Sequence, residues 1–162
     1  VTLVDTGDVS MTGGRLRRVK DFLKGEELFC FTYGDGLSSV NITDSIKFHQ
    51  NSGKLATLTA VVPPGRFGAL EIENTSVKRF KEKPRGDGAF INGGFFVLSP
   101  EVIDYIHDDA CVWEQEPLTR LSELDQLQAF QHDGFWQPMD TLRDKIYLEE
   151  LWNSNKAPWR TW

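Results

Sequence analysis

Cysteine, basic residues and long apolar runs are all scarce in this 162-residue chain. Its two cysteines, Cys30 and Cys111, are far apart, so neither a disulfide framework nor a zinc site is expected. No apolar run approaches the roughly 18 residues that a membrane span needs. The chain has 18 Lys and Arg against 24 Asp and Glu and a pI near 5.1, which argues against a nucleic-acid surface. We therefore expect neither nucleic acid nor a membrane as a partner.

The remaining composition is that of an ordinary globular protein, with 40% hydrophobic and 26% charged residues. This length supplies one substantial core. The chain starts at Val1, and residues 1–5 already have the pattern of a strand. We therefore expect the chain to begin inside a fold, without a leader sequence, and to be cytoplasmic.

The most informative stretch runs from Glu27 to Gly36. Residues 28–33 are apolar and aromatic, which predicts a strand buried on both faces. Gly34 and Gly36 then flank Asp35, which places this carboxylate at the carboxyl end of the strand, where open α/β sheets bind ligands. Gly34 allows a ligand to approach the backbone closely. Taken alone, the three residues are also typical of a β-turn with a solvated aspartate.

Helical and strand patterns alternate along the rest of the chain. Helices are predicted at 15–24, 44–50 and 142–153, strands at 55–62, 89–99 and 126–132, and a hairpin at 68–82. The strand, helix, strand order from 28 to 62 is a βαβ unit, so the fold class is α/β with a partly parallel sheet.

Two further motifs contain a basic side chain. Thr12-Gly13-Gly14-Arg15 is a glycine turn at the amino end of a predicted helix. It could bind phosphate with Arg15 beside it, or Thr12 could simply cap the helix. Glu82 and Lys83 precede a proline, and such a pair can hold a polyol and its phosphate, although a solvated charged turn has the same composition.

Two other motifs contain an amide or a carboxylate. Asn92-Gly93-Gly94 interrupts a predicted strand, which indicates a bulge or a close approach of backbone to ligand. Asp140 lies two residues before the helix predicted at 142–153 and, taken alone, would be its cap.

Six short motifs, taken in order, resemble the glucose-1-phosphate cytidylyltransferases of the sugar nucleotidyltransferase family. They are Thr12-Gly13-Gly14-Arg15, Gly34-Asp35-Gly36, Pro63-Pro64-Gly65-Arg66-Phe67-Gly68, Phe80-x-Glu82-Lys83-Pro84, Asn92-Gly93-Gly94 and Trp136-Gln137-Pro138-Met139-Asp140-Thr141. Gly-Asp-Gly and Glu-Lys-Pro are common in the wider family, whereas the last motif points to the cytidylyl branch.

The resemblance implies a Rossmann-like nucleotidyltransferase with a mixed, mostly parallel sheet flanked by helices. It implies that glucose 1-phosphate attacks the α-phosphorus of CTP, giving CDP-glucose and pyrophosphate, with Mg²⁺ as cofactor. By motif position, it implies that Asp35 and Asp140 are catalytic and hold the metal. It also implies contacts to CTP from Ser10, Arg15 and Gly34, and to the sugar phosphate from Glu82, Lys83, Asn92 and Gly93.

Two features of the family do not occur in this chain: the Gly-x-Gly-Thr-Arg loop around the triphosphate and the Lys-Pro segment with a catalytic lysine. The chain therefore resembles the carboxyl-terminal portion alone, without the amino-terminal βα units. Within this single truncated domain we expect a nucleotide-binding part at 1–62, a sugar-phosphate-binding region at 63–140 and a helix with an aromatic tail at 141–162.

Three expectations follow from this truncation. Whether the chain is an enzyme stays open, and we expect little or no activity from it alone, because the phosphate cradle is absent. We expect a homo-oligomer, because missing units expose strand edges. The alternatives are a non-catalytic sugar-phosphate-binding or self-associating module, and a thymidylyl- or uridylyltransferase relative.

Overall fold

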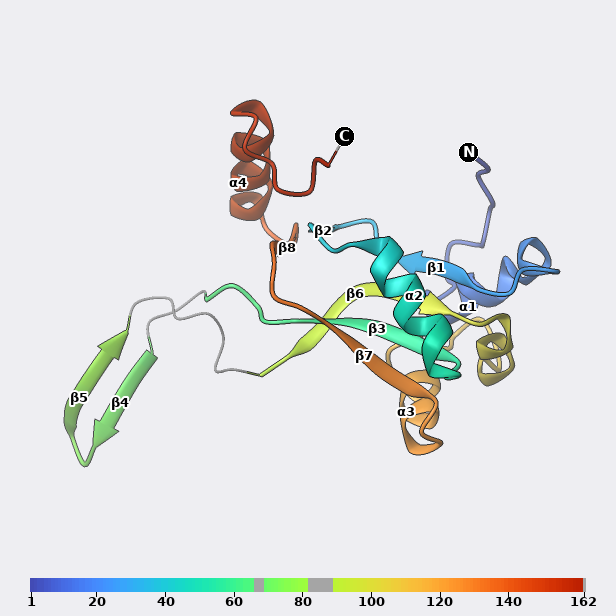
Figure 1. Ribbon diagram of the computed structural model, residues 1–162, viewed down its shortest axis with the longest axis horizontal. Helices are drawn as coiled ribbons and strands as arrows, with labels where there is room; N and C mark the ends of the chain where they lie inside the picture. Colours follow the sequence, from blue (N-terminus) through green and yellow to red (C-terminus); the bar gives the residue numbers. More distant parts are fainter. Residues whose placement is uncertain (66–68, 82–88, 162) are drawn as a thin grey trace. The chain divides into compact units, whose positions relative to one another are not determined.

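The computed structural model, drawn in Figure 1, describes residues 1–65, 69–81 and 89–161. The chain divides into two compact units. The first unit comprises Val1–Thr32, Ile42–Leu58 and Phe95–Phe130. The second comprises Tyr33–Asn41, Thr59–Gly94 and Gln131–Trp162. Each unit is therefore assembled from segments that are far apart in the sequence.

A four-stranded sheet has the strand order β1-β6-β3-β7 (Figure 1). Its strands are β1 (Phe29–Thr32), β6 (Ile91–Leu98), β3 (Ala56–Val61) and β7 (Leu127–His132). Together with the flanking helices, this sheet confirms the predicted mixed α/β class. β6 lies between β1 and β3, so the two strands of the predicted βαβ unit are not neighbours. β1 and β6 are antiparallel, with Thr32 opposite Phe95.

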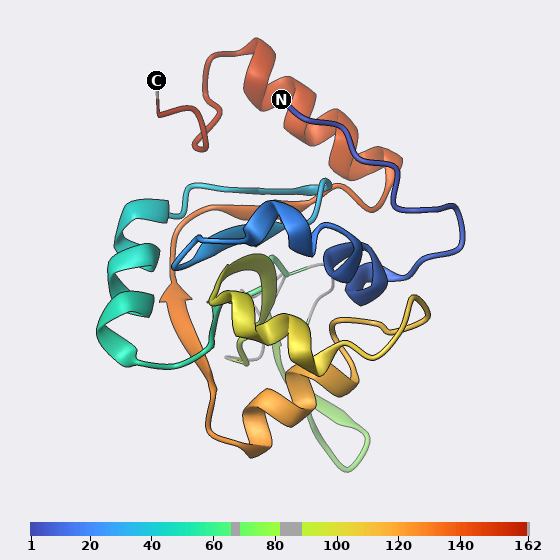
Figure 2. The same ribbon diagram turned by 90° about the vertical axis from the view of Figure 1, so that its right-hand side faces the viewer.

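The first unit contains five of the helices in the described part of the chain, and several of its segments pack around Trp113. The helices are α1 (Thr12–Arg18), η1 (Lys20–Leu23), α2 (Ile42–Ser52), η2 (Pro100–Tyr105) and α3 (Glu116–Glu123). η2 and α3 are in contact and are drawn in yellow and orange in Figure 2. Trp113 is fully buried and meets the rings of Phe31 and Phe96 edge-on, with centroids 6.4 and 6.0 Å away. Such edge-to-face pairs add to the stabilisation from buried area.

The second unit contains two antiparallel strand pairs and a long helix. β2 (Gly36–Ser38) pairs with β8 (Trp136–Pro138), and β4 (Ala69–Glu73) pairs with β5 (Ser76–Lys81). The second pair is the predicted hairpin, and Asn74 in its turn has φ 55°. α4 (Leu142–Asn153) has the predicted bounds. In the segment after it, the Trp159 ring lies 5.4 Å from the Phe135 ring, centroid to centroid.

Three local predictions are wrong. None of the described strands pairs with residues 1–5, and without a hydrogen-bonding neighbour a strand-like pattern does not form a strand. β1 is not buried on both faces but lies at the edge of its sheet, with alternating half-buried and exposed side chains. The helix predicted at 15–24 is divided between α1 and η1, which meet at Val19. Within the described part of the chain, no helix has the length and apolar character to span a bilayer.

His49 connects α2 to β3 and to Ser99, the N-cap residue of η2, through a hydrogen-bond network. Its side chain is only 4% exposed. Nδ1 lies 2.8 Å from Thr57 Oγ1, and Nε2 lies 3.3 Å from Ser99 Oγ. Thr57 Oγ1 also accepts a hydrogen bond from Gln128 Nε2 at 2.8 Å. Burial lowers the pKa of His49, because desolvation disfavours the charged ring.

This lowered pKa predicts that the fold loses stability in acid. The unfolded chain protonates His49 near pH 6.5, whereas the folded chain does so only at lower pH. The contribution of the neutral His49 ring to the free energy of unfolding is therefore lost as pH falls below about 6.5. We expect His49→Gln, which cannot titrate, to flatten the decline in urea-unfolding free energy between pH 7.5 and 5.5. Equal slopes for the variant and the parent chain would contradict this assignment.

Candidate functional site

Asp35 lies in the turn that connects β1 to β2, as the glycine-flanked sequence predicts. Gly34 and Asp35 form the turn, and β2 begins at Gly36. The Asp35 side chain is exposed. An added Cβ on Gly34 would meet no described atom within 4 Å, so the space beside this residue is open. The turn can therefore admit a ligand at the backbone of Gly34.

A short strand ladder brings Asp140 to the same place. In β2 and β8, Gly36 pairs with Pro138, Leu37 with Gln137 and Ser38 with Trp136. The ladder is extended by one more hydrogen bond, in which the Met139 N–H donates to the Asp35 carbonyl at 2.8 Å. Asp140 is the next residue and is also exposed. The two carboxylate-bearing residues therefore lie at one end of a single ladder.

Asp140 is not the helix cap that its position suggested. Thr141 is the N-cap of α4, and its side chain accepts a hydrogen bond from the Asp144 N–H at 3.3 Å. The Asp144 carboxylate in turn accepts from the Thr141 N–H at 3.0 Å, which completes a capping box. The cap falls one residue later than predicted because Thr141, not Asp140, has an acidic residue three positions on.

The donor chemistry of this pair fits Mg²⁺. Carboxylate oxygens are hard ligands, and Mg²⁺ is commonly held by one or two of them together with substrate phosphates and water. In residues 1–65, 69–81 and 89–161, no three His, Cys, Asp or Glu side chains are grouped so as to hold a metal. Two aspartates alone would leave coordination positions for phosphate oxygens, as a nucleotide site requires.

The Asn92–Gly94 motif is held from two sides by aromatic residues. Asn92 Oδ1 accepts from the Gly94 N–H at 2.9 Å, and Asn92 Nδ2 lies 3.4 Å from Tyr33 Oη. The indole N–H of Trp136 donates to the Gly93 carbonyl at 2.8 Å. Gly94 has φ +78°, and a Cβ there would lie 2.6 Å from the Tyr33 ring. The glycines thus meet packing demands of the protein itself.

The Thr12–Arg15 motif joins α1 to a loop of its own unit. The N–H groups of Gly13 and Gly14 both donate to the Cys111 carbonyl, at 3.0 and 3.2 Å. A Cβ on Gly14 would lie 2.3 Å from the Asp109 carbonyl oxygen. Thr12 is the first residue of the helix, not its cap, because the N-cap is Met11. The amino end of α1 is therefore occupied by backbone carbonyl groups.

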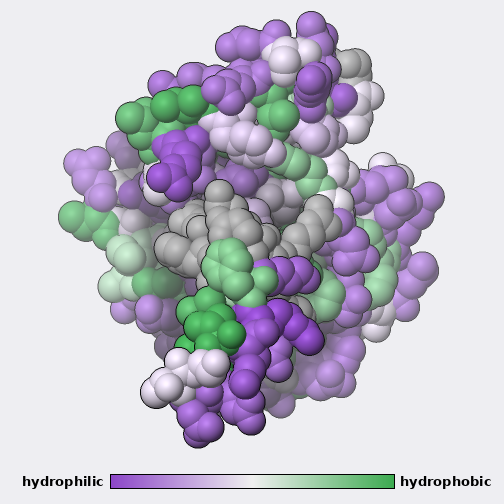
Figure 3. All heavy atoms as spheres, turned by 90° about the vertical axis from the view of Figure 1, so that its left-hand side faces the viewer, coloured by the Kyte–Doolittle hydropathy of each residue, from purple (hydrophilic) through white to green (hydrophobic). Residues whose placement is uncertain are grey.

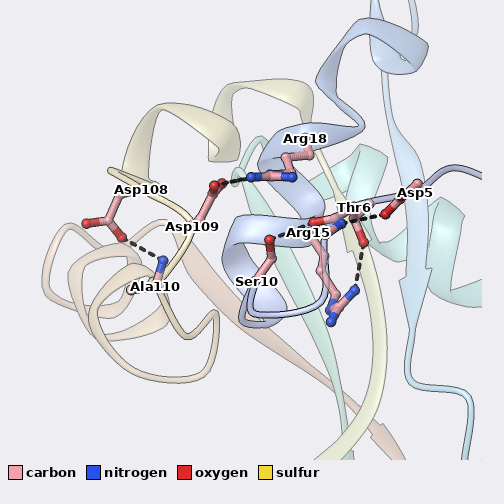
Figure 4. A network of polar contacts seen from close by, with 9 residues as sticks. Asp5, Thr6, Ser10, Arg15, Arg18, Asp108, Asp109 and Ala110 are labelled. Atoms are coloured by element: carbon pink, nitrogen blue, oxygen red, sulfur yellow. Dashed lines mark hydrogen bonds and ion pairs between the residues drawn. The ribbon is translucent and has the colours of Figure 1, made fainter.

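Ser10 and Arg15 hold the segment that precedes α1 (Figure 4). Ser10 is 4% exposed, and its hydroxyl donates to the Thr6 carbonyl at 2.6 Å. Arg15 is exposed, and its Nη1 donates to Thr6 Oγ1 at 2.8 Å. In the same view, Arg18 pairs with Asp109, and its hydrogen bond lowers the pKa of that carboxyl.

The candidate residues are divided between the two units. Gly34, Asp35, Asn92, Gly93 and Asp140 belong to the second unit. Ser10 and Arg15 belong to the first unit. Glu82 and Lys83 lie outside the described residues. Four further residues contact the candidate motifs or the cap of α4, and the sequence alone assigned no role to them: Tyr33, Trp136, Gln137 and Asp144. Trp136 and Gln137 belong to the Trp-Gln-Pro-Met-Asp-Thr motif, which was the available signal.

Comparisons with known proteins agree with the motifs. The family described as nucleotidyl transferase matches residues 12–137. The glucose-1-phosphate cytidylyltransferase of Salmonella typhi is 64% identical over 162 residues, which are 100% of this chain and 63% of that relative. Mannose-1-phosphate guanyltransferase beta-A of Xenopus laevis is 31% identical over 151 residues, covering 86% of this chain and 42% of that protein.

Solved structures share the fold. The crystal structure of HddC from Yersinia pseudotuberculosis matches 90% of this chain and 64% of its own, with a TM-score of 0.63 and 21% identity. The chain thus spans less than two thirds of the length of both relatives and of this structural neighbour.

Two glycines of the candidate motifs should respond differently to an added methyl group. Gly14→Ala places Cβ against the Asp109 backbone, so we expect it to lower the free energy of unfolding by about 1–3 kcal/mol, as overpacking does. Gly34→Ala has open space and serves as the matched control, with unchanged stability. Urea unfolding followed by circular dichroism measures both. A stable Gly14→Ala variant would contradict the close approach of α1 to the loop.

Proposed function

Because this chain belongs to the nucleotidyl transferase family, we propose that it contains the metal-binding and sugar-phosphate-binding part of a glucose-1-phosphate cytidylyltransferase. The reaction would join CTP and glucose 1-phosphate to give CDP-glucose and pyrophosphate. The observation that carries the proposal is the 2.8 Å hydrogen bond from Met139 N–H to the Asp35 carbonyl, because it brings the Asp35 and Asp140 loops together. The substrates are suggested by the name of the Salmonella typhi relative. We place the reaction in the cytoplasm, where nucleoside triphosphates are made.

Each residue in this proposal has a role in binding or orientation. Asp35 and Asp140 would hold Mg²⁺ through their exposed carboxylates. The chemistry that Mg²⁺ supplies when bound is to offset charge on the leaving pyrophosphate, an effect worth several kcal/mol. Asn92 and Gly93 would position the sugar phosphate, and the Tyr33 hydroxyl and Trp136 indole would fix their orientation. No protein nucleophile is needed, since alignment and electrostatics suffice for phosphoryl chemistry.

The nucleotide contacts are the less complete part of this proposal. Gly34 offers open space for a nucleotide, and Ser10 and Arg15 would contact CTP only by giving up or sharing their bonds to Thr6. The Gly-x-Gly-Thr-Arg loop is absent from the sequence. The second candidate function is therefore a sugar-phosphate-binding module without catalysis. A thymidylyl or uridylyl preference would change the base and leave the proposed metal site unaltered.

Catalysis should depend on the aspartate pair. We expect the chain alone to release little pyrophosphate from CTP and glucose 1-phosphate with Mg²⁺. Fused to the part of the Salmonella typhi relative outside the matched region, it should turn over, and Asp35→Asn or Asp140→Asn should each reduce kcat/KM by about 10²-fold or more, the scale of losing one electrostatic stabiliser. Asp104→Asn, which removes an exposed carboxylate of η2, is the control with unchanged rate.

The alternatives give different results in the same assay. A fused chain without turnover that still binds glucose 1-phosphate by calorimetry would favour the non-catalytic module. Faster turnover with dTTP or UTP than with CTP would indicate a thymidylyl- or uridylyltransferase instead of a cytidylyltransferase. Full activity in both aspartate variants would refute the metal site.

We also propose that the protein is a homo-oligomer that associates through the β4–β5 hairpin. Four apolar side chains of the hairpin are more than half exposed, and the strand pairing places Leu70 beside Phe80 and Ile72 beside Val77 on one face. This apolar hairpin face consists of Leu70, Ile72, Val77 and Phe80. An isolated two-stranded hairpin is marginally stable in water, so such a face calls for a partner.

The charges of the hairpin are compatible with a second copy of the chain as that partner. β4 carries Glu71 and Glu73, whereas β5 carries Lys78, Arg79 and Lys81. Within the hairpin Lys78 pairs with Glu73 at 3.3 Å and Arg79 with Glu71 at 3.4 Å, and a second copy docked strand to strand offers each of these side chains the same kind of partner. Figure 3 shows that apolar and hydrophilic side chains lie next to one another on this side of the molecule.

Removing the apolar face should dissociate the oligomer. We expect the 162-residue chain to elute as an oligomer in size-exclusion chromatography with light scattering, and Leu70→Ser/Phe80→Ser to elute as a monomer. Leu142→Ser, which removes a 71% exposed leucine of α4, is the matched control and should remain oligomeric. A monomeric parent chain would refute the proposal.

A further inference from the structure

Gln137 is a buried polar residue that the proposed chemistry does not use. It lies in β8 and is only 7% exposed. Its Nε2 donates to Asp144 Oδ1 at 3.0 Å and to the Pro138 carbonyl at 3.1 Å. Burying a side-chain amide costs free energy unless it is hydrogen-bonded, so this link to Asp144 is part of what allows glutamine at this position.

Asp144 uses its two carboxylate oxygens for two different segments. Oδ2 accepts from the Thr141 N–H at 3.0 Å and from Thr141 Oγ1 at 2.8 Å, which forms the capping box of α4. Oδ1 accepts from Gln137. A capping box requires only the bonds to Thr141. The bond to Gln137 is additional, and it ties β8 to the first turn of α4.

The loop between these anchors contains Asp140. On its amino side, the Met139 N–H donates to the Asp35 carbonyl. On its carboxyl side, Thr141 is fixed by Asp144, and Asp144 is fixed by Gln137. The backbone of Asp140 is thus held immediately before and immediately after the residue. Such support from neighbouring groups orients metal ligands and commonly affects metal affinity.

We propose that Gln137 and Asp144 are positioning residues that hold the Asp140 carboxylate in place for a divalent cation shared with Asp35. This inference rests on the proposed function, because it requires the aspartate pair to bind metal. Gln137 and Asp144 act through the Asp140 backbone and do not contact the metal or the substrates.

Mn²⁺ binding to the 162-residue chain, measured by the paramagnetic resonance signal of the free ion, tests the inference without an activity assay. We expect Gln137→Met, which keeps the size and removes the amide, to weaken Mn²⁺ binding by up to about 10-fold, the lower end of the range for direct partners of metal ligands, because Gln137 acts through Asp144 and Thr141. The double variant Gln137→Glu/Asp144→Asn exchanges donor and acceptor between these two residues and gives up the bond from residue 137 to the Pro138 carbonyl, while the asparagine oxygen can still accept from Thr141. It should recover part of the affinity lost in Gln137→Met.

A purely structural role would give a different pattern. Leu148→Ala removes a buried leucine of α4 and should lower stability by about 2–5 kcal/mol while leaving Mn²⁺ affinity unchanged. Unchanged Mn²⁺ affinity in Gln137→Met, with a large loss in Asp140→Asn, would overturn the inference and leave the proposed metal site in place. Unchanged affinity in Asp140→Asn would overturn the metal site itself, and the inference with it.

Discussion

The hydrogen bond between the Met139 N–H and the Asp35 carbonyl is the constraint on which the candidate site depends. It extends the β2–β8 ladder by one hydrogen bond, and this bond places Asp35 and Asp140 at the same end of the ladder. Because side chains alternate along a strand, a one-residue shift in this register would change which residues face each other at the end of the ladder. The positions of the two loops are set first by backbone pairing, and the hydrogen bonds among Gln137, Thr141 and Asp144 hold the loop that contains Asp140.

Backbone packing also explains the glycines of the candidate motifs. Gly13 and Gly14 let α1 approach the Cys111 carbonyl, and Gly94 leaves room for the Tyr33 ring. Neither group of glycines needs a ligand to account for it. At Gly34, by contrast, an added Cβ would enter open space. Glycine at a functional motif can therefore serve close packing and ligand access within the same chain.

Buried polar groups need hydrogen-bond partners, whereas exposed apolar groups need to be covered from water, and the two units differ in which of these groups they contain. In the first unit, His49 is satisfied by the hydroxyls of Thr57 and Ser99, and burial lowers its pKa because desolvation disfavours the charged ring. In the second unit, the hairpin exposes Leu70 and Phe80, which an isolated pair of strands cannot bury. The hydrogen-bond partners of His49 are supplied within the chain. The exposed apolar side chains of the hairpin are the physical basis for proposing a partner copy.

The sequence by itself determined the α/β class, the hairpin, the bounds of α4 and the motifs that resemble sugar nucleotidyltransferases, because periodicity, turn residues and local motifs are properties of neighbouring residues. It did not reveal that residues 1–5 form no strand, that β1 is an edge strand or that Thr141 caps α4. Only the tertiary structure decided these points and the pairing of the Asp35 and Asp140 loops. Strand pairing and side-chain hydrogen bonds such as Gln137 to Asp144 depend on which segments come into contact in the folded chain. A local sequence pattern does not specify those contacts.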